Sequence, residues 1–292
     1  MTRTLFELAD GSVIGTHHRR NGENNQDASA IYQDDMLTIG IVCDGCSDSK
    51  FSESGSRIGS RLILQSLVKQ LKRYYQSTID WSTQPSPAAW STDRRFWDRI
   101  ERDTTSSLHQ LAQQMGESLT EQIAMHFLFT TIGFIIAPTG GVFFSFGDGV
   151  IVVNGEVLQI GPFPGNAPPY IGYQLVNSRI GTENPELLKF QVHREIPLAD
   201  LNTFMVGTDG VLDLKRSAER PLPGKSSRVR PLSQFWEEDQ YFLNPDMANR
   251  LLRLANQEVH IFDPVTRALL KTEFGILPDD TTFIVGRRRK EG

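Results

Sequence analysis

The chain has 292 residues, of which 39% are hydrophobic and 22% are charged, and its formal net charge is −5. This composition is typical of a folded globular protein and excludes disordered and collagen-like classes. The acidic balance argues against nucleic acid as a partner, because binding it requires a basic face.

No apolar run approaches the length of a membrane span, so we expect no membrane partner. The first ten residues contain acids and lack the apolar centre of a secretory signal. The two cysteines, Cys43 and Cys46, are fewer than a disulfide-stapled secreted protein normally carries. These features predict a cytoplasmic protein, and the sequence indicates no particular oligomeric state.

The N-terminal part is predicted to form strands. A first strand leads into a polar loop within residues 15–27, and a second strand passes through Ala30, Ile31 and Tyr32. The Asp34-Asp35 pair predicts a turn into a third strand over Met36–Val42. We therefore expect the chain to begin with antiparallel strands.

Two long helices are expected next. Serines and Glu53 suit a helix start at Ser52, and apolar residues follow at helical spacing as far as Leu71. An irregular, proline-bearing connection is expected over 77–92. A second helix is predicted from about Asp93 to Ala124, and the polar run 104–107 is where we expect any break.

Short apolar runs then predict a series of strands. They cover Phe127–Ala137, Val142–Phe146, Val150–Val153, Glu156–Ile160, 190–196 and 203–207. The dipeptide Asn154-Gly155 predicts a two-residue hairpin turn.

The C-terminal part mixes helices with one last strand. Residues 217–246 form a basic, proline-bearing segment that resembles an insertion. Helices are predicted over about Met247–Glu258 and Pro264–Thr272, and a strand over Asp280–Gly286. The whole order lacks regular β-α alternation. It favours an α+β fold in which antiparallel sheets pack together under helices, and we expect one domain over 1–292.

Four aspartates stand at strand margins far apart in the sequence. They are Asp27, Asp44, Asp209 and Asp279. A single Asp-Gly after a strand is more often a turn than a ligand. Four converging carboxylates instead suit a hard cation such as Mg²⁺ or Mn²⁺, and the carbonyl of Gly45 could add a further oxygen ligand.

The motifs around these aspartates occur in a characteristic order. They are Gly15-Thr-His-His, Asn25-Gln-Asp27-Ala, Ile41-Val-Cys-Asp44-Gly45-Cys46, Ser52-Glu-Ser-Gly, Thr131-Ile-Gly, Phe146-Gly-Asp148, Val206-Gly-Thr-Asp209-Gly210 and Pro278-Asp279-Asp280-Thr-Thr-Phe-Ile-Val. In this order, over nearly the whole chain, the sequence resembles the metal-dependent protein serine/threonine phosphatases of type 2C (the PPM family), and its bacterial branch in particular.

The resemblance implies a four-layer α/β/β/α sandwich of two antiparallel sheets flanked by helices, with two Mn²⁺ or Mg²⁺ ions at one edge. It implies that Asp44 bridges both ions, that the Gly45 carbonyl is a ligand, and that Asp209 and Asp279 bind the first ion. Asp27 resembles an acid in the water shell of the second ion. Asp148 resembles the family's structural Gly-Asp turn.

Three positions depart from the family pattern. Gly22 stands where many relatives have a phosphate-binding arginine, so His18, Arg19 or Arg20 would have to provide that contact. Cys46 replaces a histidine that is a plausible general acid in animal enzymes, which leaves His18 as a candidate for proton transfer. An acid for a third metal, expected near Met125, is missing.

The implied function is hydrolysis of phosphoserine and phosphothreonine in a phosphorylated protein substrate, by water activated between two metal ions. Two alternatives stay open. One is a pseudophosphatase that binds phosphorylated partners without turnover, and the other is a phosphatase of a small phosphorylated molecule.

Overall fold

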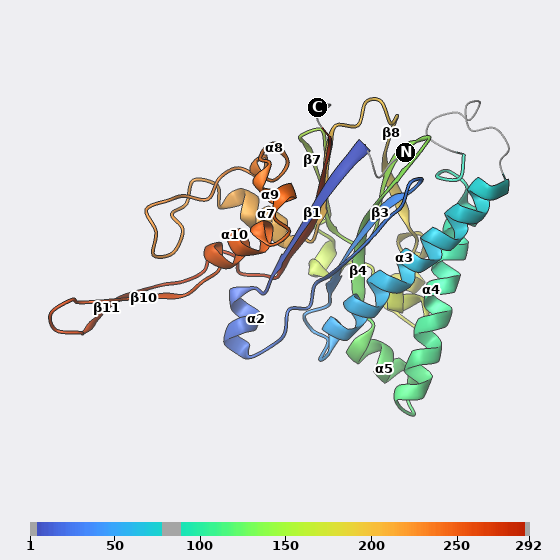
Figure 1. The fold of residues 1–292 in the computed structure, drawn as a ribbon. Coiled ribbons are helices and arrows are strands. Elements are labelled where there is room, and N and C mark those ends of the chain that lie inside the picture. Colours follow the sequence, from blue (N-terminus) through green and yellow to red (C-terminus); the bar gives the residue numbers. More distant parts are fainter. Residues whose placement is uncertain (1–4, 78–88, 290–292) are drawn as a thin grey trace.

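A computed structural model describes residues 5–77 and 89–289, and Figure 1 shows its layers. Most of the irregular connection expected over 77–92 lies outside the described residues. Two five-stranded sheets form the centre. One has the order β1-β12-β9-β6-β7 and the other the order β2-β3-β4-β5-β8, and all pairings within them are antiparallel.

The strands of the first sheet are β1 (Phe6–Val13), β6 (Gly149–Val153), β7 (Glu156–Ile160), β9 (Thr203–Gly207) and β12 (Thr281–Arg288). Those of the second are β2 (Ala28–Gln33), β3 (Thr38–Gly45), β4 (Phe129–Ala137), β5 (Gly140–Phe146) and β8 (Gln191–Ile196). The predicted strands are thereby confirmed. Asn154 and Gly155 both have positive φ in the β6–β7 turn, which confirms the predicted hairpin.

The longer helices are α3 (Ser52–Ser77), α4 (Arg94–Met115), α5 (Leu119–His126) and α10 (Met247–Ala255). Shorter ones are α2 (Thr16–Asn21), α6 (Arg179–Glu183), α7 (Gly210–Arg216), α8 (Gln234–Glu237) and α9 (Gln240–Leu243), with 3-10 turns at 164–166, 171–174 and 185–187. In Figure 1, α3 and α4 cover the sheet that contains β3, and α7–α10 lie on the side of β1.

Strand alternation produces three apolar layers between these elements. Ile39 and Ile41 of β3 face α3 and α4, whereas Val42 faces the other sheet. Phe134 of β4 and Phe204 of β9 pack in the middle layer with ring centroids 4.7 Å apart. On the outer face of the first sheet, apolar side chains of the strands pack against α7, α8 and α10. The chain therefore has the expected α+β fold, a four-layer α/β/β/α sandwich.

The predicted break in the second long helix was wrong. Residues 104–107 are helical, because Thr104 and Leu108 are buried on the packed face of α4, and tertiary packing outweighs the weak helix propensity of the run. The interruption lies instead at Gly116, after which Ser118 caps α5 by accepting the N–H of Glu121.

Two other predictions of local structure were also wrong. The polar segment expected as a loop contains α2, which begins after Gly15 and ends at the left-handed Gly22. The segment Pro264–Thr272, expected as a helix, forms part of a turn and most of β11 (Leu269–Glu273), which pairs with β10 (Val259–Phe262). Asp263 makes its turn by accepting the N–H groups of Val265 and Thr266, and this turn chemistry outweighs the helical spacing.

The insertion-like segment 217–246 packs against the first sheet. Leu222, Val229, Leu232, Phe235 and Tyr241 are buried in the outer apolar layer. Phe235 lies 4.6 Å from Phe283 of β12, measured between ring centroids. This segment therefore supplies part of the helical layer.

Within the described residues, no helix combines the length and apolar character that crossing a membrane requires.

Candidate active site

Strand register brings the predicted aspartates to one end of the two sheets. Ala28 pairs with Cys43, which sets Asp27 at the start of β2 beside Asp44 near the end of β3. Phe283 pairs with Gly207, so the acids before β12 lie near Asp209 after β9. Antiparallel neighbours place the start of one strand beside the end of the next.

A small polar cavity of about 60 Å³ lies at this end of the sheets. The predicted residues His18, Asp44, Gly45, Asp209 and Asp279 line it, together with Asp148, Cys46, Ser47, Thr130, Pro168 and Tyr170. Among the described residues of its wall there is no lysine or arginine. The cavity is therefore strongly acidic.

Asp27 lies behind this wall and is 4% exposed. Its Oδ2 accepts the hydroxyl hydrogen of Thr208, at 2.8 Å. The Thr208 hydroxyl oxygen in turn accepts the N–H of Thr282, at 3.1 Å. These contacts join β2 of one sheet to β9 and β12 of the other, so they fix the two sheets relative to each other at the cavity.

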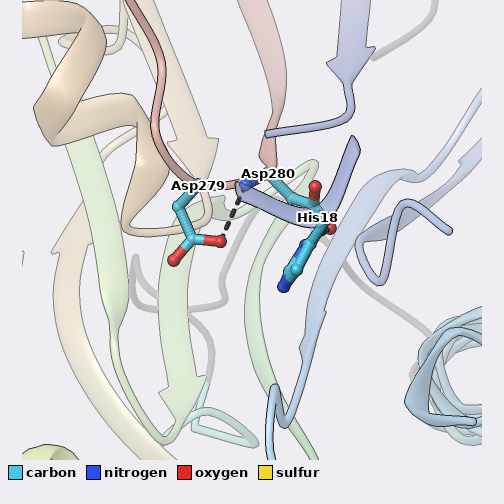
Figure 2. Close-up of side chains that lie close together, drawn as sticks. All are labelled: His18, Asp279 and Asp280. Carbon is cyan, nitrogen blue, oxygen red and sulfur yellow. Dashed lines mark hydrogen bonds and ion pairs between the residues drawn. The ribbon is translucent and has the colours of Figure 1, made fainter. Parts of the chain in front are cut away.

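Asp280 anchors the segment that carries His18. Its two oxygens accept the N–H groups of Gly15 and Gln26, both at 2.6 Å. Oδ2 of Asp280 also lies 2.9 Å from Nδ1 of His18. Figure 2 shows His18 beside Asp279 and Asp280, with the N–H of Asp280 donating to Oδ1 of Asp279. Ligand atoms of these three residues lie within 4.8 Å of one another.

Burial and mutual repulsion raise the pKa values of four carboxyl groups at this end of the sheets. Burial raises the pKa of Asp209 to about 7, and the neighbouring Asp279 and Asp148 add to the effect. Burial, with Asp279, raises the pKa of Asp148 to about 6. The pKa values of Asp27 and Asp44 are also well above the ordinary range, chiefly through burial and then through neighbouring acids.

A cation fits this donor set. Oδ1 of Asp27 and Oδ1 of Asp209 are buried and accept no hydrogen bond from the described part of the protein. Buried carboxylate oxygens without donors are costly unless positive charge offsets them. Oxygen donors of this kind suit Mg²⁺ and Mn²⁺.

The motif glycines allow the acids to approach closely. A Cβ on Gly210 would lie 2.0 Å from the carbonyl oxygen of Asp280, and one on Gly45 would lie 2.8 Å from the side chain of Ser52. Gly147 and Gly149, which flank Asp148, have φ of 96° and 141°. The Asp-Gly pattern therefore reflects close packing at the cavity.

The structure places Arg19 and Arg20 away from the cavity wall. Nη1 of Arg19 donates to the carbonyl of Asn256, at 2.6 Å, and the guanidinium of Arg20 lies 4.4 Å from the ring centroid of Phe274. Of the three residues proposed to bind phosphate, His18 alone lines the cavity. The contacts of Arg19 and Arg20 attach α2 to Asn256 and Phe274.

Several residues at the site were missed or ranked too low by sequence reasoning. Asp148, interpreted as a structural turn, lines the cavity beside the other acids. Asp280 anchors α2, and its place beside Asp279 was the signal available. Tyr170 comes from a Pro/Gly-rich loop, and no local pattern distinguishes it.

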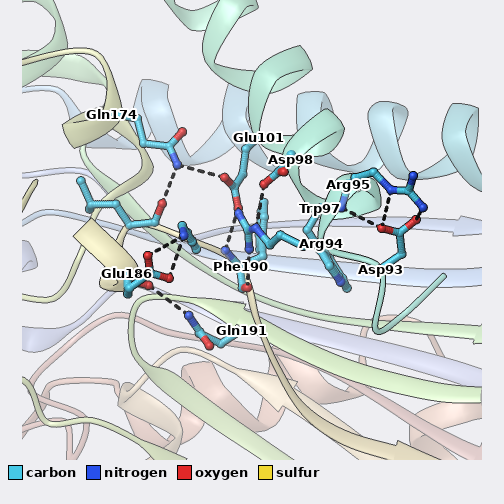
Figure 3. Close-up of polar contacts among 12 residues, drawn as sticks. Asp93, Arg94, Arg95, Trp97, Asp98, Glu101, Gln174, Glu186, Phe190 and Gln191 are labelled. Carbon is cyan, nitrogen blue, oxygen red and sulfur yellow. Dashed lines mark hydrogen bonds and ion pairs between the residues drawn. The ribbon is translucent and has the colours of Figure 1, made fainter. Parts of the chain in front are cut away.

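The segment after Tyr170 is tied to α4 by a polar network that includes Gln174 (Figure 3). Glu101, 8% exposed, accepts the N–H of Phe190 at 2.9 Å and the amide N–H of Gln174 at 3.2 Å. Arg94 pairs with Glu101 and donates to the carbonyl of Phe190. The segment that forms one wall of the cavity is thereby held on the helical layer.

The fold and the acidic cavity define an α/β/β/α sandwich protein with a candidate metal centre at one end of its sheets. The family model for protein phosphatase 2C matches residues 14–253. The chain belongs to the protein phosphatase 2C family.

Solved structures support the same fold. A bacterial serine phosphatase is 15% identical, with a TM-score of 0.52, and the match covers 98% of this chain and 99% of that one. A variant of a bacterial serine phosphatase with an arginine replaced by alanine is also 15% identical, with a TM-score of 0.53 and coverage of 98% and 100%. Among curated proteins, no sequence matches this chain.

Proposed function

We propose that this protein is a metal-dependent phosphatase that hydrolyses phosphoserine and phosphothreonine in phosphorylated proteins, with two Mn²⁺ or Mg²⁺ ions as cofactors. Membership of the protein phosphatase 2C family supports the reaction class. The observation that carries the proposal is the acidic cavity itself. Asp44, Asp148, Asp209 and Asp279 share one wall, and buried Asp27 lies behind it.

In this proposal the ions would be held by Asp44, Asp209, Asp279 and the Gly45 carbonyl. Asp27, buried behind the cavity wall, would contact the water shell of the second ion. When bound, divalent ions acidify water and offset the negative charge of a phosphoryl group. The carboxyl groups must then lose their protons. The raised pKa values of Asp44 and Asp209 predict that metal binding releases protons.

His18 would bind a phosphoryl oxygen or transfer a proton at the cavity. Its Nδ1 faces Asp280, and Nε2 lies 3.6 Å from Glu23. These contacts orient the ring. Thr130 and Tyr170 line the same cavity, and their hydroxyl groups could donate to phosphoryl oxygens.

The test is phosphate release from an aryl phosphate and from a phosphothreonine peptide by chelator-treated protein, before and after addition of Mn²⁺. We expect release only with the metal. Folded, metal-loaded protein that releases no phosphate from either compound would contradict the proposal.

One observation favours a second candidate, a pseudophosphatase. The described cavity wall offers no arginine or lysine to bind phosphate. Such a protein would bind the phosphothreonine peptide in the presence of metal but leave it intact. Measuring peptide binding beside phosphate release therefore separates the two functions.

A further inference from the structure

The β10–β11 hairpin exposes apolar side chains that pack on no core. Phe262 is 53% exposed, Leu269 55%, Leu270 61% and Val265 86%. Figure 1 shows the hairpin extending away from the sandwich, at the end of the sheets where α2 lies. A two-stranded hairpin is only marginally stable in water, and exposed apolar patches mark interaction sites.

The charges of the hairpin favour a protein partner. Arg267 and Lys271 are balanced by Glu258, Asp263 and Glu273. A surface that binds nucleic acid or an anionic membrane would carry an excess of basic residues. Both outer strand edges are also free of strand pairing within the described residues, because β10 and β11 form a sheet of their own.

The base of the hairpin is fixed to the loop that leads into α2. Asn256, which is fully buried and precedes β10, donates its amide N–H to the carbonyl of Ile14 at 2.5 Å. Its Oδ1 accepts the N–H of Leu277, which follows β11, at 3.1 Å. Both ends of the hairpin are therefore held at one point.

The same base reaches the candidate active site through α2. Arg20 stacks on Phe274 directly after β11, and Arg19 donates to Asn256. On the same helix His18, which directly precedes Arg19, lines the cavity. The hairpin and the cavity thus share α2 as a common wall.

The size of the cavity requires contacts outside it. The volume of the cavity is only about 60 Å³. It can receive a phosphoryl group, but it leaves little room for the residues that flank a phosphorylated side chain. Any preference among protein substrates must therefore come from the surrounding surface.

We propose that the β10–β11 hairpin is a docking surface for the substrate, where an extended segment flanking the phosphorylated residue binds along a free strand edge. This inference rests on the proposed function. Main-chain hydrogen bonds would hold the segment, and exposed residues such as Phe262 and Leu269 would contact its alternate side chains. The occupant is a phosphorylated polypeptide, in extended conformation beside the phosphorylated residue.

The experiment compares three probes on the full chain: p-nitrophenyl phosphate, a phosphothreonine peptide of about six residues, and one of about twenty with valine at alternate positions. The test variant is Phe262→Ser combined with Leu269→Ser. The control is Leu243→Ser, which removes an 82% exposed leucine from α9. The single variant Phe262→Ser serves if circular dichroism shows that the double variant is unfolded.

We expect wild-type kcat/KM to be about tenfold higher for the long peptide than for the short one. The hairpin variants should lose this advantage and keep wild-type turnover of p-nitrophenyl phosphate, while the control keeps both. Anisotropy of the labelled long peptide gives a second readout that needs no turnover, so a lack of phosphatase activity would leave the docking test intact. Equal long-peptide binding and kcat/KM in the wild type and the variants would overturn the inference. So would a hairpin-dependent dimer in sedimentation, because it would assign the surface to a second copy of the chain.

Discussion

Oδ2 of Asp280 lies 2.9 Å from Nδ1 of His18, and the Asp280 side chain is only 2% exposed. The same carboxylate accepts two backbone N–H groups, from Gly15 and Gln26. The segment containing α2 is therefore attached to the start of β12 through one acid.

Replacing Asp280 should weaken both the fold and the site. In Asp280→Ala the buried N–H groups of Gly15 and Gln26 lose their acceptor, and an unsatisfied buried donor costs about 1–3 kcal/mol. We expect urea unfolding to show a loss of that size or larger. Asp280→Asn, which keeps oxygen and shape but loses charge, should lose less. Equal stability of Asp280→Ala and the wild type would show that α2 is held by other contacts.

The hydroxyl of Thr208 is predicted to hold the two sheets together at the cavity. Thr208→Val keeps the shape but removes the donor to Asp27 and the acceptor for Thr282. We expect a loss of about 1–3 kcal/mol in the free energy of unfolding. Thr272→Val on the exposed hairpin, where the hydroxyl contacts His260, is the matched control and should change stability by under about 0.5 kcal/mol. A similar loss in both variants would contradict a special role for Thr208.

Gly210→Ala should disrupt the turn after Asp209. The new Cβ would lie 2.0 Å from the carbonyl oxygen of Asp280, a backbone atom that can move only with β12. We expect a loss of stability of about 1–3 kcal/mol or more, together with weaker Mn²⁺ binding in a calorimetric titration. Gly116→Ala is the control, because its Cβ meets the flexible amide end of Gln122. Wild-type metal affinity in Gly210→Ala would argue against close packing as the reason for the motif.

The metal-free protein should become less stable as the pH rises from about 4 to about 7. The Asp209 carboxyl group has a pKa of about 7 in the folded protein, against an ordinary value of 3.8, so in this window the unfolded chain binds fewer protons. Stability then falls by at most about 1.4 kcal/mol per pH unit for each such group. Asp148, with a pKa of about 6, contributes over the lower part of the window.

Urea unfolding in chelator at several pH values measures this slope. Asp209→Asn removes the titrating group and should flatten the slope, and Mn²⁺ should reverse it by stabilising the ionised carboxylates. A wild-type slope equal to that of Asp209→Asn would show that the acid does not titrate as inferred.

Much of the fold followed from the sequence because strand patterns and turns are local signals. The dipeptide Asn154-Gly155 predicted its hairpin, and the apolar spacing after Ser52 predicted α3. Residues 264–272 also carry a helix-like spacing, but the turn contacts of Asp263 and strand pairing with β10 decide their structure. The spacing of apolar residues along a short segment carries no information about such competing contacts.

The site was predictable where a motif combines an acid with a glycine, as at Asp44 and Asp209. Asp148 carries the same combination, yet its place on the cavity wall depends on how the β5–β6 turn meets the other sheet. Tyr170 also lines the cavity, and the segment that follows it is attached to α4 through the amide of Gln174, which donates to Glu101 far away in the sequence. These placements arise from tertiary packing.

The central claim is that the acidic cavity binds divalent metal and that this metal is required for phosphate release. The most direct measurement titrates Mn²⁺ into metal-free wild type and Asp44→Asn, following free Mn²⁺ by electron paramagnetic resonance and p-nitrophenyl phosphate hydrolysis in the same samples. We predict two Mn²⁺ ions per wild-type chain, with hydrolysis rising as they bind. In folded Asp44→Asn we predict weakened binding and no hydrolysis. Hydrolysis that persists in Asp44→Asn, or that appears in wild type without bound metal, would contradict the account.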